Sequence, residues 1–495
     1  MRITVRTVSA VLLILLAAGC SSVGETAAPD AENGSVPVPE EAAAEAETED
    51  PYELITALTT EDFGGYTFSI LGEIMRDHYE SEELNGDALN DAVYKRNLDV
   101  GERYGVELTY DLRDWKTAPG IIRNTVSAGD GAYDLATATH LNLGGNLTGG
   151  HFLPWNDAEA VDMTRPYYVA AANRTYSIGT GTMLLFGDFM DSNINNCWVF
   201  VFNKKLTADY GLEDAALYQS VDDGKWTVDR FLSLVSDIYE DVDGGGERDQ
   251  GDVYGFVTDI YGSVDSFSRT MGLSAISKDE NNYPYLDFYG ETTVDAYGTL
   301  YRIWYETTGI WGKYSAFAQT TGSFITDRAV FSNNLMITLY DDNMRSMESD
   351  YGILPYPKYF PEADHYSTYL DGTFSAQMLL VTLDAESVRR TGVITEALNA
   401  YSRQYVVPAL YDNALKGKAA RDPDSARMID LVMAGREFSF DSFDESNFPL
   451  SPNRILRTNI GAGKNDITAL YRSAEKTANK WIDKMVGQFE ESYGG

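Results

Sequence analysis

The sequence predicts an α/β protein made of two lobes, each a sheet flanked by helices, and three observations carry this prediction. The chain has 495 residues, 44% of them hydrophobic, which is enough for two or three domains. Residues 66–138 alternate strand and helix patterns in the order βαβαβ. This order favours a parallel sheet, because parallel strands need crossover connections. A second unit of the same kind begins at residue 197.

The first unit consists of five segments. Alternating or continuous apolar residues predict its strands, and apolar residues at helical spacing predict its helices. Gly105 ends the first helix. The strands are predicted at residues 66–71, 106–110 and 133–138, and the helices at residues 88–104 and 117–128.

The second unit begins with the apolar strand 197–202. Thr227 is placed to cap a helix that buries Val228 and Phe231, and Asp466 to cap a long amphipathic helix at the end of the chain. Further strands are predicted at residues 253–257, 335–339 and 375–382, with a crossing segment at 350–355. The two halves of the chain therefore read as α/β lobes of similar size.

The N-terminal residues predict a secretory signal over 1–19, with a short basic start and an apolar run too short to span a membrane. Its end, Leu-Ala-Ala-Gly-Cys-Ser-Ser, resembles a bacterial lipobox, in which Cys20 is acylated, for example with palmitate. The alternative is an ordinary cleaved signal with a chance cysteine. Residues 20–58 predict an acidic linker, because they are rich in Ala, Glu, Pro and Ser. We therefore expect a lipid-anchored protein on the extracytoplasmic face of the cell membrane.

Composition excludes several classes of function. A formal charge of −38 opposes nucleic-acid binding, because phosphates are bound by clustered Lys and Arg. Two cysteines exclude a disulfide scaffold and a cysteine zinc site. Cys197 is expected to be a buried small hydrophobe. No nucleophile elbow, zinc-protease motif or P-loop is present, so no cofactor is required and catalysis has little support.

Several motifs in order resemble those of bacterial extracellular solute-binding lipoproteins of the maltose-binding type (family 1), the receptors of ABC importers. They are the lipobox with its acidic tether, Tyr133-Asp134-Leu135, residues 199–206, Tyr210-Gly211-Leu212, residues 223–229, Tyr254-Gly255-Phe256 and residues 351–358. The resemblance implies a periplasmic-binding-protein-like fold with a multi-strand hinge. It assigns lobe 1 to residues 59–196 plus 365–415 and lobe 2 to residues 197–364 plus 416–495.

The resemblance also implies function. The chain would be a monomeric, non-enzymatic receptor that holds a small solute, most simply a carbohydrate, between its lobes and docks on the permease subunits of an importer. Two other classes stay open: a surface glycan-binding, adhesion or sensing module, and a secreted glycan-active enzyme.

Candidate ligand contacts follow from the rule that ligands bind at the carboxyl ends of strands in such sheets. For His140 the alternative is a structural turn, and for Trp155 buried packing is favoured. Tyr340 is the strongest single candidate, because the resemblance places an aromatic platform there. The predicted contacts are Glu73, Thr139, His140, Trp155, Asp259, Tyr261, Tyr340, Asp342 and Arg345.

Residues 241–252 resemble a calcium loop of the EF-hand or dockerin type, which would serve as a structural brace. Gly245 stands where an oxygen ligand is expected, so one ligand is missing. The alternative is an acidic, solvated turn. The predicted ligands are Asp241, Asp243, Glu247, Asp249 and Asp252.

Overall fold

A computed structural model describes residues 51–74 and 77–493. The signal peptide 1–19, Cys20 and most of the predicted linker 20–58 lie outside the described residues. Helix α1, Pro51–Thr56, falls inside the range predicted as linker. The side chains of Leu54 and Ile55 are buried there, and α1 packs on helix α15, Ala385–Tyr401. The folded body therefore begins before residue 59, because these apolar side chains have a partner surface.

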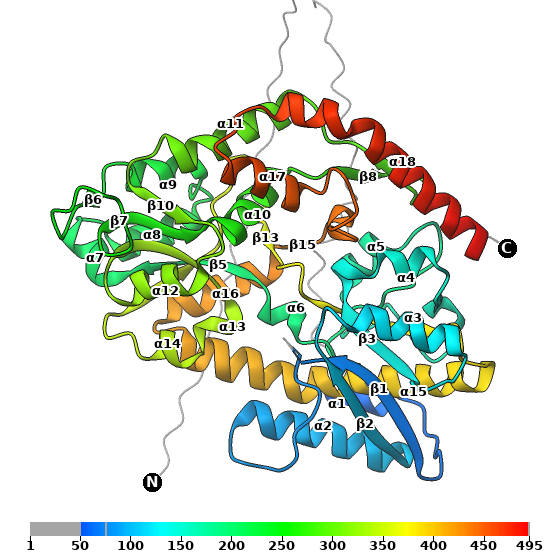
Figure 1. The fold of residues 1–495 in the computed structure, drawn as a ribbon. Helices are drawn as coiled ribbons and strands as arrows, with labels where there is room; N and C mark the ends of the chain where they lie inside the picture. Colours follow the sequence, from blue (N-terminus) through cyan, green and yellow to red (C-terminus); the bar gives the residue numbers. More distant parts are fainter. Residues whose placement is uncertain (1–50, 75–76, 494–495) are drawn as a thin grey trace, which may run out of the picture. The chain divides into compact units, whose positions relative to one another are not determined.

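Helices and strands alternate along the chain (Figure 1). The other helices are α2 Ala88–Tyr104, α3 Ala118–Ala128, α4 Gly144–Thr148, α5 Ala170–Tyr176, α6 Ser192–Asn195, α7 Lys204–Asp209, α8 Asp214–Asp222, α9 Val228–Val235, α10 Ile260–Thr270, α11 Glu291–Tyr305, α12 Phe317–Ile325, α13 Met336–Leu339, α14 Asp342–Arg345, α16 Pro423–Ala434, α17 Pro452–Gly461 and α18 Ile467–Tyr493. Single turns of 3₁₀ helix are η1 His140–Asn142, η2 Trp155–Asp157 and η5 Phe440–Ser442, and η3 Ser402–Val406 and η4 Ala409–Ala419 are π-helical segments.

The strands are β1 Tyr66–Glu73, β2 Val106–Arg113, β3 Leu135–Thr139, β4 Phe152–Leu153, β5 Trp198–Asn203, β6 Tyr239–Glu240, β7 Val253–Asp259, β8 Ile276–Lys278, β9 Pro284–Leu286, β10 Ile310–Lys313, β11 Ala329–Leu335, β12 Tyr351–Leu354, β13 Thr368–Tyr369, β14 Ser375–Leu380 and β15 Arg436–Glu437. The helix caps predicted at Thr227 and Asp466 are confirmed: Thr227 accepts a hydrogen bond from the Arg230 N–H, and Asp466 from the Ala469 N–H.

The first sheet, which defines lobe 1, has the strand order β2-β1-β3-β14-β4. Strand β1 pairs in parallel with β2 and β3, with Tyr66 opposite Val106 and Ile70 opposite Leu135. Helices α2 and α3 make the crossovers and pack on these strands. The predicted βαβαβ unit is confirmed, and the last strand β14 returns from much later in the chain to pair antiparallel with β3.

The second sheet, which defines lobe 2, has the order β10-β7-β11-β5-β12, with β6 beside β7. Strand β7 is parallel to β10 and β11, and β5 is antiparallel to β11 and β12. The strand predicted at 335–339 is wrong, because β11 ends at Leu335 and Met336–Leu339 is helix α13. The strand holds buried Asn333 and Asn334, which break the apolar pattern that the prediction relied on.

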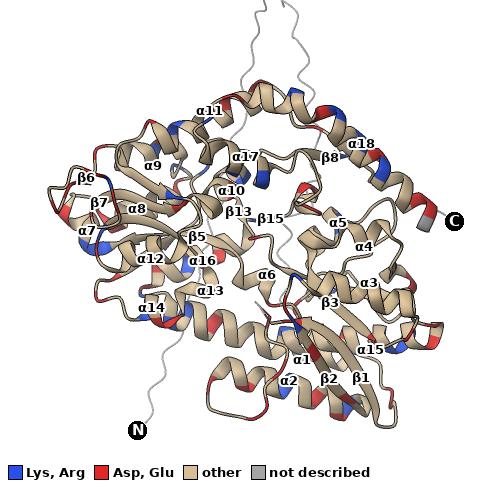
Figure 2. Cartoon of the chain, in the orientation of Figure 1, with Lys and Arg blue, Asp and Glu red and all other residues tan. Residues whose placement is uncertain are grey.

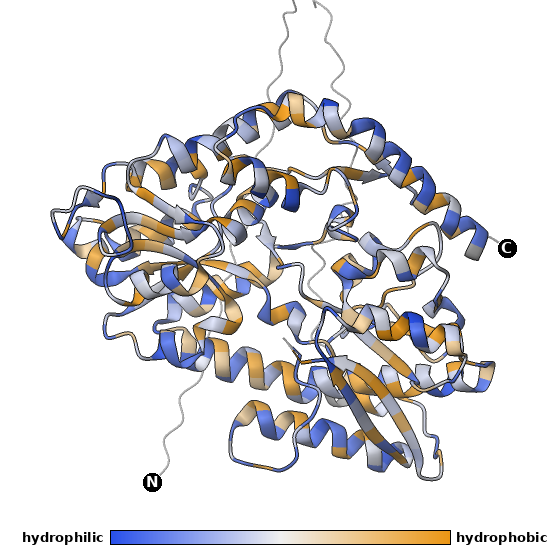
Figure 3. Ribbon diagram, in the orientation of Figure 1, coloured by the Kyte–Doolittle hydropathy of each residue, from blue (hydrophilic) through white to orange (hydrophobic). Residues whose placement is uncertain are grey.

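The cores follow the apolar residues of the strands (Figure 3). In lobe 2 the ring of Phe200 stacks on Phe256, with centroids 5.1 Å apart, and Tyr356 meets Phe200 edge-on at 4.6 Å. Acidic residues occur along both lobes, with basic residues between them (Figure 2). Among residues 51–74 and 77–493, no helix combines the length and apolar character that a membrane crossing requires.

Several segments connect the lobes. Cys197, just before β5, makes a β-bridge to Leu370, and β13 pairs in parallel with β15. The long helical run from α15 through η3 and η4 packs on α2 in lobe 1 and on α13 and α16 in lobe 2 (Figure 1). These neighbouring connections are where rotation of one lobe against the other would be absorbed.

Candidate functional site

Glu73 and Thr139 lie side by side at the carboxyl ends of β1 and β3, as the sequence predicted for neighbouring parallel strands. Glu73 is only 2% exposed, and the Thr139 hydroxyl donates to its Oε2 at 2.6 Å. Its other oxygen, Oε1, is buried and has no hydrogen-bond partner. Burial raises the pKa of Glu73 to about 8. A buried carboxyl group with one unpaired oxygen can receive a donor from a ligand.

His140, one residue further on, is a structural residue by its contacts. Its Nδ1 lies 3.2 Å from the Phe374 carbonyl, and its Nε2 lies 3.1 Å from the Ser442 hydroxyl and 3.2 Å from that of Tyr176. The side chain is fully buried, and burial lowers the pKa of His140 to about 4. These contacts favour the structural turn over a ligand contact.

Trp155 takes the buried position that the sequence favoured. Its exposed fraction is 0%, and its Nε1 donates to the Gln377 carbonyl at 3.0 Å. The indole therefore fixes η2 against β14 and keeps no free polar group.

Sequence reasoning missed an ion pair between His78 and Asp191, and the chain neighbour of His78, Asp77, adds to the rise in the pKa of Glu73 through its charge, after the larger effect of burial. His78 Nδ1 is 2.6 Å from Asp191 Oδ2, and the His78 N–H donates to Oδ1 at 3.0 Å. Asp191 is 1% exposed, whereas the His78 side chain is 38% exposed. The negative charge of Asp191 raises the pKa of His78. His78 follows no strand or helix pattern, so no periodicity could have indicated it.

Asp77 connects this pair to helix α6. Its carboxylate accepts the Ser192 N–H at 2.7 Å. Burial, together with the nearby charge of Asp191, raises the pKa of Asp77 to about 6. On the far side of α6, the Tyr340 hydroxyl donates to Asn195 Oδ1 at 2.8 Å, so this helix is bonded to both lobes.

The three ligand contacts predicted after β11 differ in their burial in the structure. Tyr340 is half-buried beside α6, as just described. Asp342 and Arg345 are exposed on helix α14. They follow a helix and not a strand end, so the rule that selected them does not apply to them.

In lobe 2, Tyr261 is presented at the start of α10. Asp259 caps this helix, with its carboxylate accepting the Tyr261 N–H at 2.8 Å. The Tyr261 ring lies 3.6 Å from the guanidinium carbon of Arg457 and is 37% exposed. Arg457 is held by Asp265 and by Glu445, the latter at 2.9 Å. Tyr261 is thus a fixed aromatic ring with one part open to solvent.

Some buried polar side-chain atoms in these two regions have no hydrogen-bond partner. Native proteins pair nearly all such atoms, so each of them is a group that a ligand or water can complete. Asn196 is tied to the segment before β14, because the Asp371 N–H donates to the Asn196 carbonyl at 2.8 Å. Among these atoms are Glu73 Oε1, Asn196 Oδ1, Trp198 Nε1, Asn334 Nδ2 and Ser451 Oγ. We call these residues, with His78, Asp191 and Tyr261, the interlobe site.

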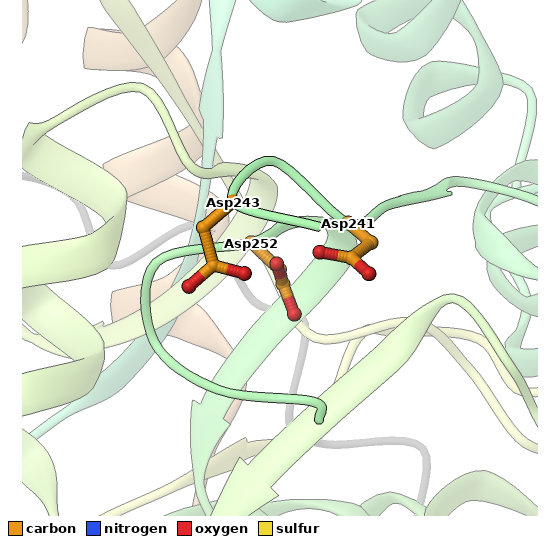
Figure 4. A group of neighbouring side chains, drawn as sticks. All are labelled: Asp241, Asp243 and Asp252. Atoms are coloured by element: carbon orange, nitrogen blue, oxygen red, sulfur yellow. The ribbon is translucent and has the colours of Figure 1, made fainter. Parts of the chain in front are cut away.

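The acidic loop 241–252 gathers three of its five predicted ligands. Carboxylate oxygens of Asp241, Asp243 and Asp252 lie within 4.8 Å of one another (Figure 4). Asp241 accepts the N–H groups of Gly244 and Gly246, and the buried Asp252 accepts further backbone and tyrosine donors. The carboxylates of Glu247 and Asp249 are exposed and stand outside this group, and the backbone carbonyl that Glu247 is predicted to supply stays a prediction. Calcium binding stays a prediction.

Solved structures with the same fold are known. UgpB of Mycobacterium tuberculosis, solved in complex with glycerophosphocholine, is 15% identical with a TM-score of 0.54, covering 86% of this chain and 99% of its own. The GacH receptor of Streptomyces glaucescens, solved unliganded and with acarbose, is 12% identical with a TM-score of 0.53, covering 85% and 99%. An ABC substrate-binding protein of Listeria monocytogenes, solved with cycloalternan, is 10% identical with a TM-score of 0.52, covering 86% and 99%.

These likenesses establish the fold. The predicted two-lobed, periplasmic-binding-protein-like class is confirmed over most of the chain. No protein-family model matches the sequence. No curated protein sequence matches it either.

Proposed function

We propose that this protein is the substrate-binding component of an ABC importer and holds a small solute, most simply a carbohydrate, at the interlobe site. The observation that carries the proposal is the set of unpaired buried donors and acceptors that both lobes of this fold hold. Hydroxyl groups both donate and accept, so a sugar complements such a mixed set. The likeness to receptors solved with acarbose and cycloalternan supports the same class.

Binding would proceed without chemistry. Lobe 1 offers Glu73 and His78, and lobe 2 offers the ring of Tyr261. A solute that contacts both lobes binds the closed arrangement best and shifts the population towards it. The closed form is the species that would dock on the permease subunits.

The proposal includes an extracytoplasmic, lipid-anchored location. It rests on the sequence around Cys20, which lies outside the described residues. A Cys20→Ser variant should leave the membrane fraction of the producing cells and appear in the soluble fraction. Retention of this variant at the membrane would contradict lipid anchoring through Cys20.

A thermal-shift screen of the purified chain against mono- and oligosaccharides tests the proposed ligand class. A sugar present at about 100 times its Kd stabilises the folded state by about 2.7 kcal/mol. The sugar should then be recovered unchanged after prolonged incubation. Release of a shorter product would indicate a glycan-active enzyme, and stabilisation only by polymeric glycans would indicate an adhesion module.

A further inference from the structure

The turn of the β8–β9 hairpin of lobe 2 lies against lobe 1. It follows helix α10 and precedes α11, so both of its covalent attachments are in lobe 2. Its turn is closed by the Asp279 N–H, which donates to the Tyr283 carbonyl at 2.9 Å. Asn282 in this turn has a φ of 65°, a left-handed conformation that Asn adopts more readily than most residues.

The hairpin turn bonds to the lobe 1 segment that follows α5. The Asn282 side-chain amide donates to the Ser177 hydroxyl and to the Gly179 carbonyl, both at 2.9 Å. The Gly179 N–H donates in return to the Asn282 carbonyl at 3.2 Å. One residue of lobe 2 therefore makes three hydrogen bonds to lobe 1.

Lys278 on β8 adds a second anchor. Its ammonium group donates to the carbonyl of Arg174 at 3.1 Å and to that of Ser177. Both carbonyls lie at the C-terminal end of α5, where backbone acceptors lack partners within the helix. A cation is favoured at this end of a helix.

The base of the hairpin is tied to the end of β3. Fully buried Asp441 accepts the Ala275 N–H at 2.6 Å and the Ser274 hydroxyl at 2.8 Å. Its neighbour Ser442 contacts His140. The hairpin thus adjoins the same sheet edge as the interlobe site.

Helix α18 supports the hairpin and also reaches both lobes (Figure 1). Near its start, Tyr471 stacks on Tyr289 of lobe 2 with centroids 4.8 Å apart. At its end, the Tyr493 hydroxyl accepts the Phe152 N–H of lobe 1 at 3.4 Å. Rotation about the connecting strands must therefore break or displace contacts on this side.

We infer that the β8–β9 hairpin is a latch between the lobes: docked through Asn282 and Lys278, it holds the arrangement seen here, and it must detach before the lobes separate. If the lobes must separate for solute to enter and leave, the latch would also control solute exchange, and this consequence rests on the proposed function. The latch itself does not rest on it. Loss of two ordinary hydrogen bonds should shift the docked-to-detached ratio by about tenfold.

Hydrogen exchange of the full chain tests the latch without any ligand. Asn282→Gly removes the amide and keeps the left-handed turn, because Gly adopts positive φ freely. We expect the Gly179 N–H to exchange about tenfold faster in Asn282→Gly and in Lys278→Met. Asn281→Gly is the matched control, because Asn281 is the exposed neighbour in the same turn. Equal exchange in all three variants and the unchanged chain would overturn the inference.

A disulfide provides the reverse test. Ser177→Cys with Asn282→Cys joins the latch covalently, and spin labels at Leu98→Cys and Val294→Cys in separate lobes report their distance. Both label positions are exposed, at 43% and 39%. The experiment uses a Cys20→Ser background: the latch pair is oxidised first, the two exposed cysteines are then labelled through thioether bonds that survive reduction, and the latch disulfide is reduced last. We expect the longer distances to vanish on oxidation and return on reduction.

A distance distribution unaffected by oxidation would contradict the latch. Failure of the sugar screen would contradict the proposed function alone, because neither latch experiment contains a solute.

Discussion

The ends of β1 and β3 are neighbours in one parallel sheet, yet the side chains that follow them differ. Glu73 keeps one buried oxygen without a partner. His140 has partners at both ring nitrogens, supplied by Phe374, Ser442 and Tyr176. The position of a residue at a strand end therefore indicates only that it lies at the ligand-binding edge of the sheet. Whether its side chain can bind a ligand depends on whether one of its polar atoms lacks a hydrogen-bond partner.

The largest expected change in the free energy of unfolding is that of a substitution at Glu73. Its pKa is 4.5 in the unfolded chain and about 8 in the folded one, so the contribution of the neutral carboxyl to stability is complete below pH 4.5 and is lost as pH rises through 8. Glu73→Gln mimics the neutral acid. It should match the unchanged protein at pH 4.5 and exceed its free energy of unfolding by about 4 kcal/mol above pH 8.

Urea unfolding across this pH range measures the difference. Glu107→Gln, at an exposed position on the neighbouring strand β2, is the control and should show no such trend. A pH-independent difference for Glu73→Gln would mean that Glu73 is ionised in the folded protein.

His140→Ala should reduce the free energy of unfolding by about 3 kcal/mol, because it removes a buried ring and leaves polar partners unpaired. The ring of Phe374, 4.1 Å away by centroid, would lose its neighbour. His365→Ala, whose side chain is 60% exposed, is the matched control. If His140→Ala kept its stability and instead abolished sugar binding, the structural role would be refuted.

Lowering the pH should destabilise the protein through His140, because this buried ring is bonded at both nitrogens in its neutral form. The pKa of His140 is 6.5 in the unfolded chain and about 4 in the folded one, so the unfolded chain takes up a proton first as pH falls. This group should remove up to about 3 kcal/mol of stability between pH 6.5 and 4. The slope should be absent from His140→Ala, and its persistence there would assign it to other groups.

Lobe 2 also has a side chain whose polar group is used within the protein and, close by in the chain, one that is partly exposed to solvent. Asp259 is used as a helix cap, whereas Tyr261 is 37% exposed beside Arg457. Tyr261→Ala should weaken binding of a sugar found by the screen by about tenfold, through lost ring contact. Calorimetry on this variant and on Tyr305→Ala, a tyrosine that is 45% exposed at the end of α11, distinguishes a contact at the site from an effect of any surface tyrosine. Equal affinities would remove Tyr261 from the site.

The smallest expected change in stability is the one that Ca²⁺ causes at the acidic loop 241–252. Both oxygens of Asp241 already accept backbone N–H groups, and Asp252 is bonded as well. Ca²⁺ should therefore raise the unfolding temperature by less than about 2 °C. A larger rise that disappears in Asp243→Asn would establish the calcium site that the sequence predicts.

Much of the fold could be predicted from local pattern. The βαβαβ unit, Gly105 as a helix end and the caps at Thr227 and Asp466 depend on neighbours within a few residues, and these are confirmed. The strand at 335–339 was misplaced because buried Asn333 is paired across the sheet, with its Oδ1 accepting the Thr258 hydroxyl at 2.7 Å. The spacing of residues around Asn333 does not indicate that Thr258 is its partner.

The sequence by itself determined the alternation of strands and helices, the acidic charge and the sheet edge where Glu73 and Thr139 meet, because these follow from residue type and short-range periodicity. Only the tertiary structure decided which groups at that edge remain unpaired. Ser442 reaches His140 from 302 positions away, and Asp191 reaches His78 from 113. Hydrogen-bond saturation depends on such distant partners, so it is fixed by how segments far apart in the sequence fold against each other.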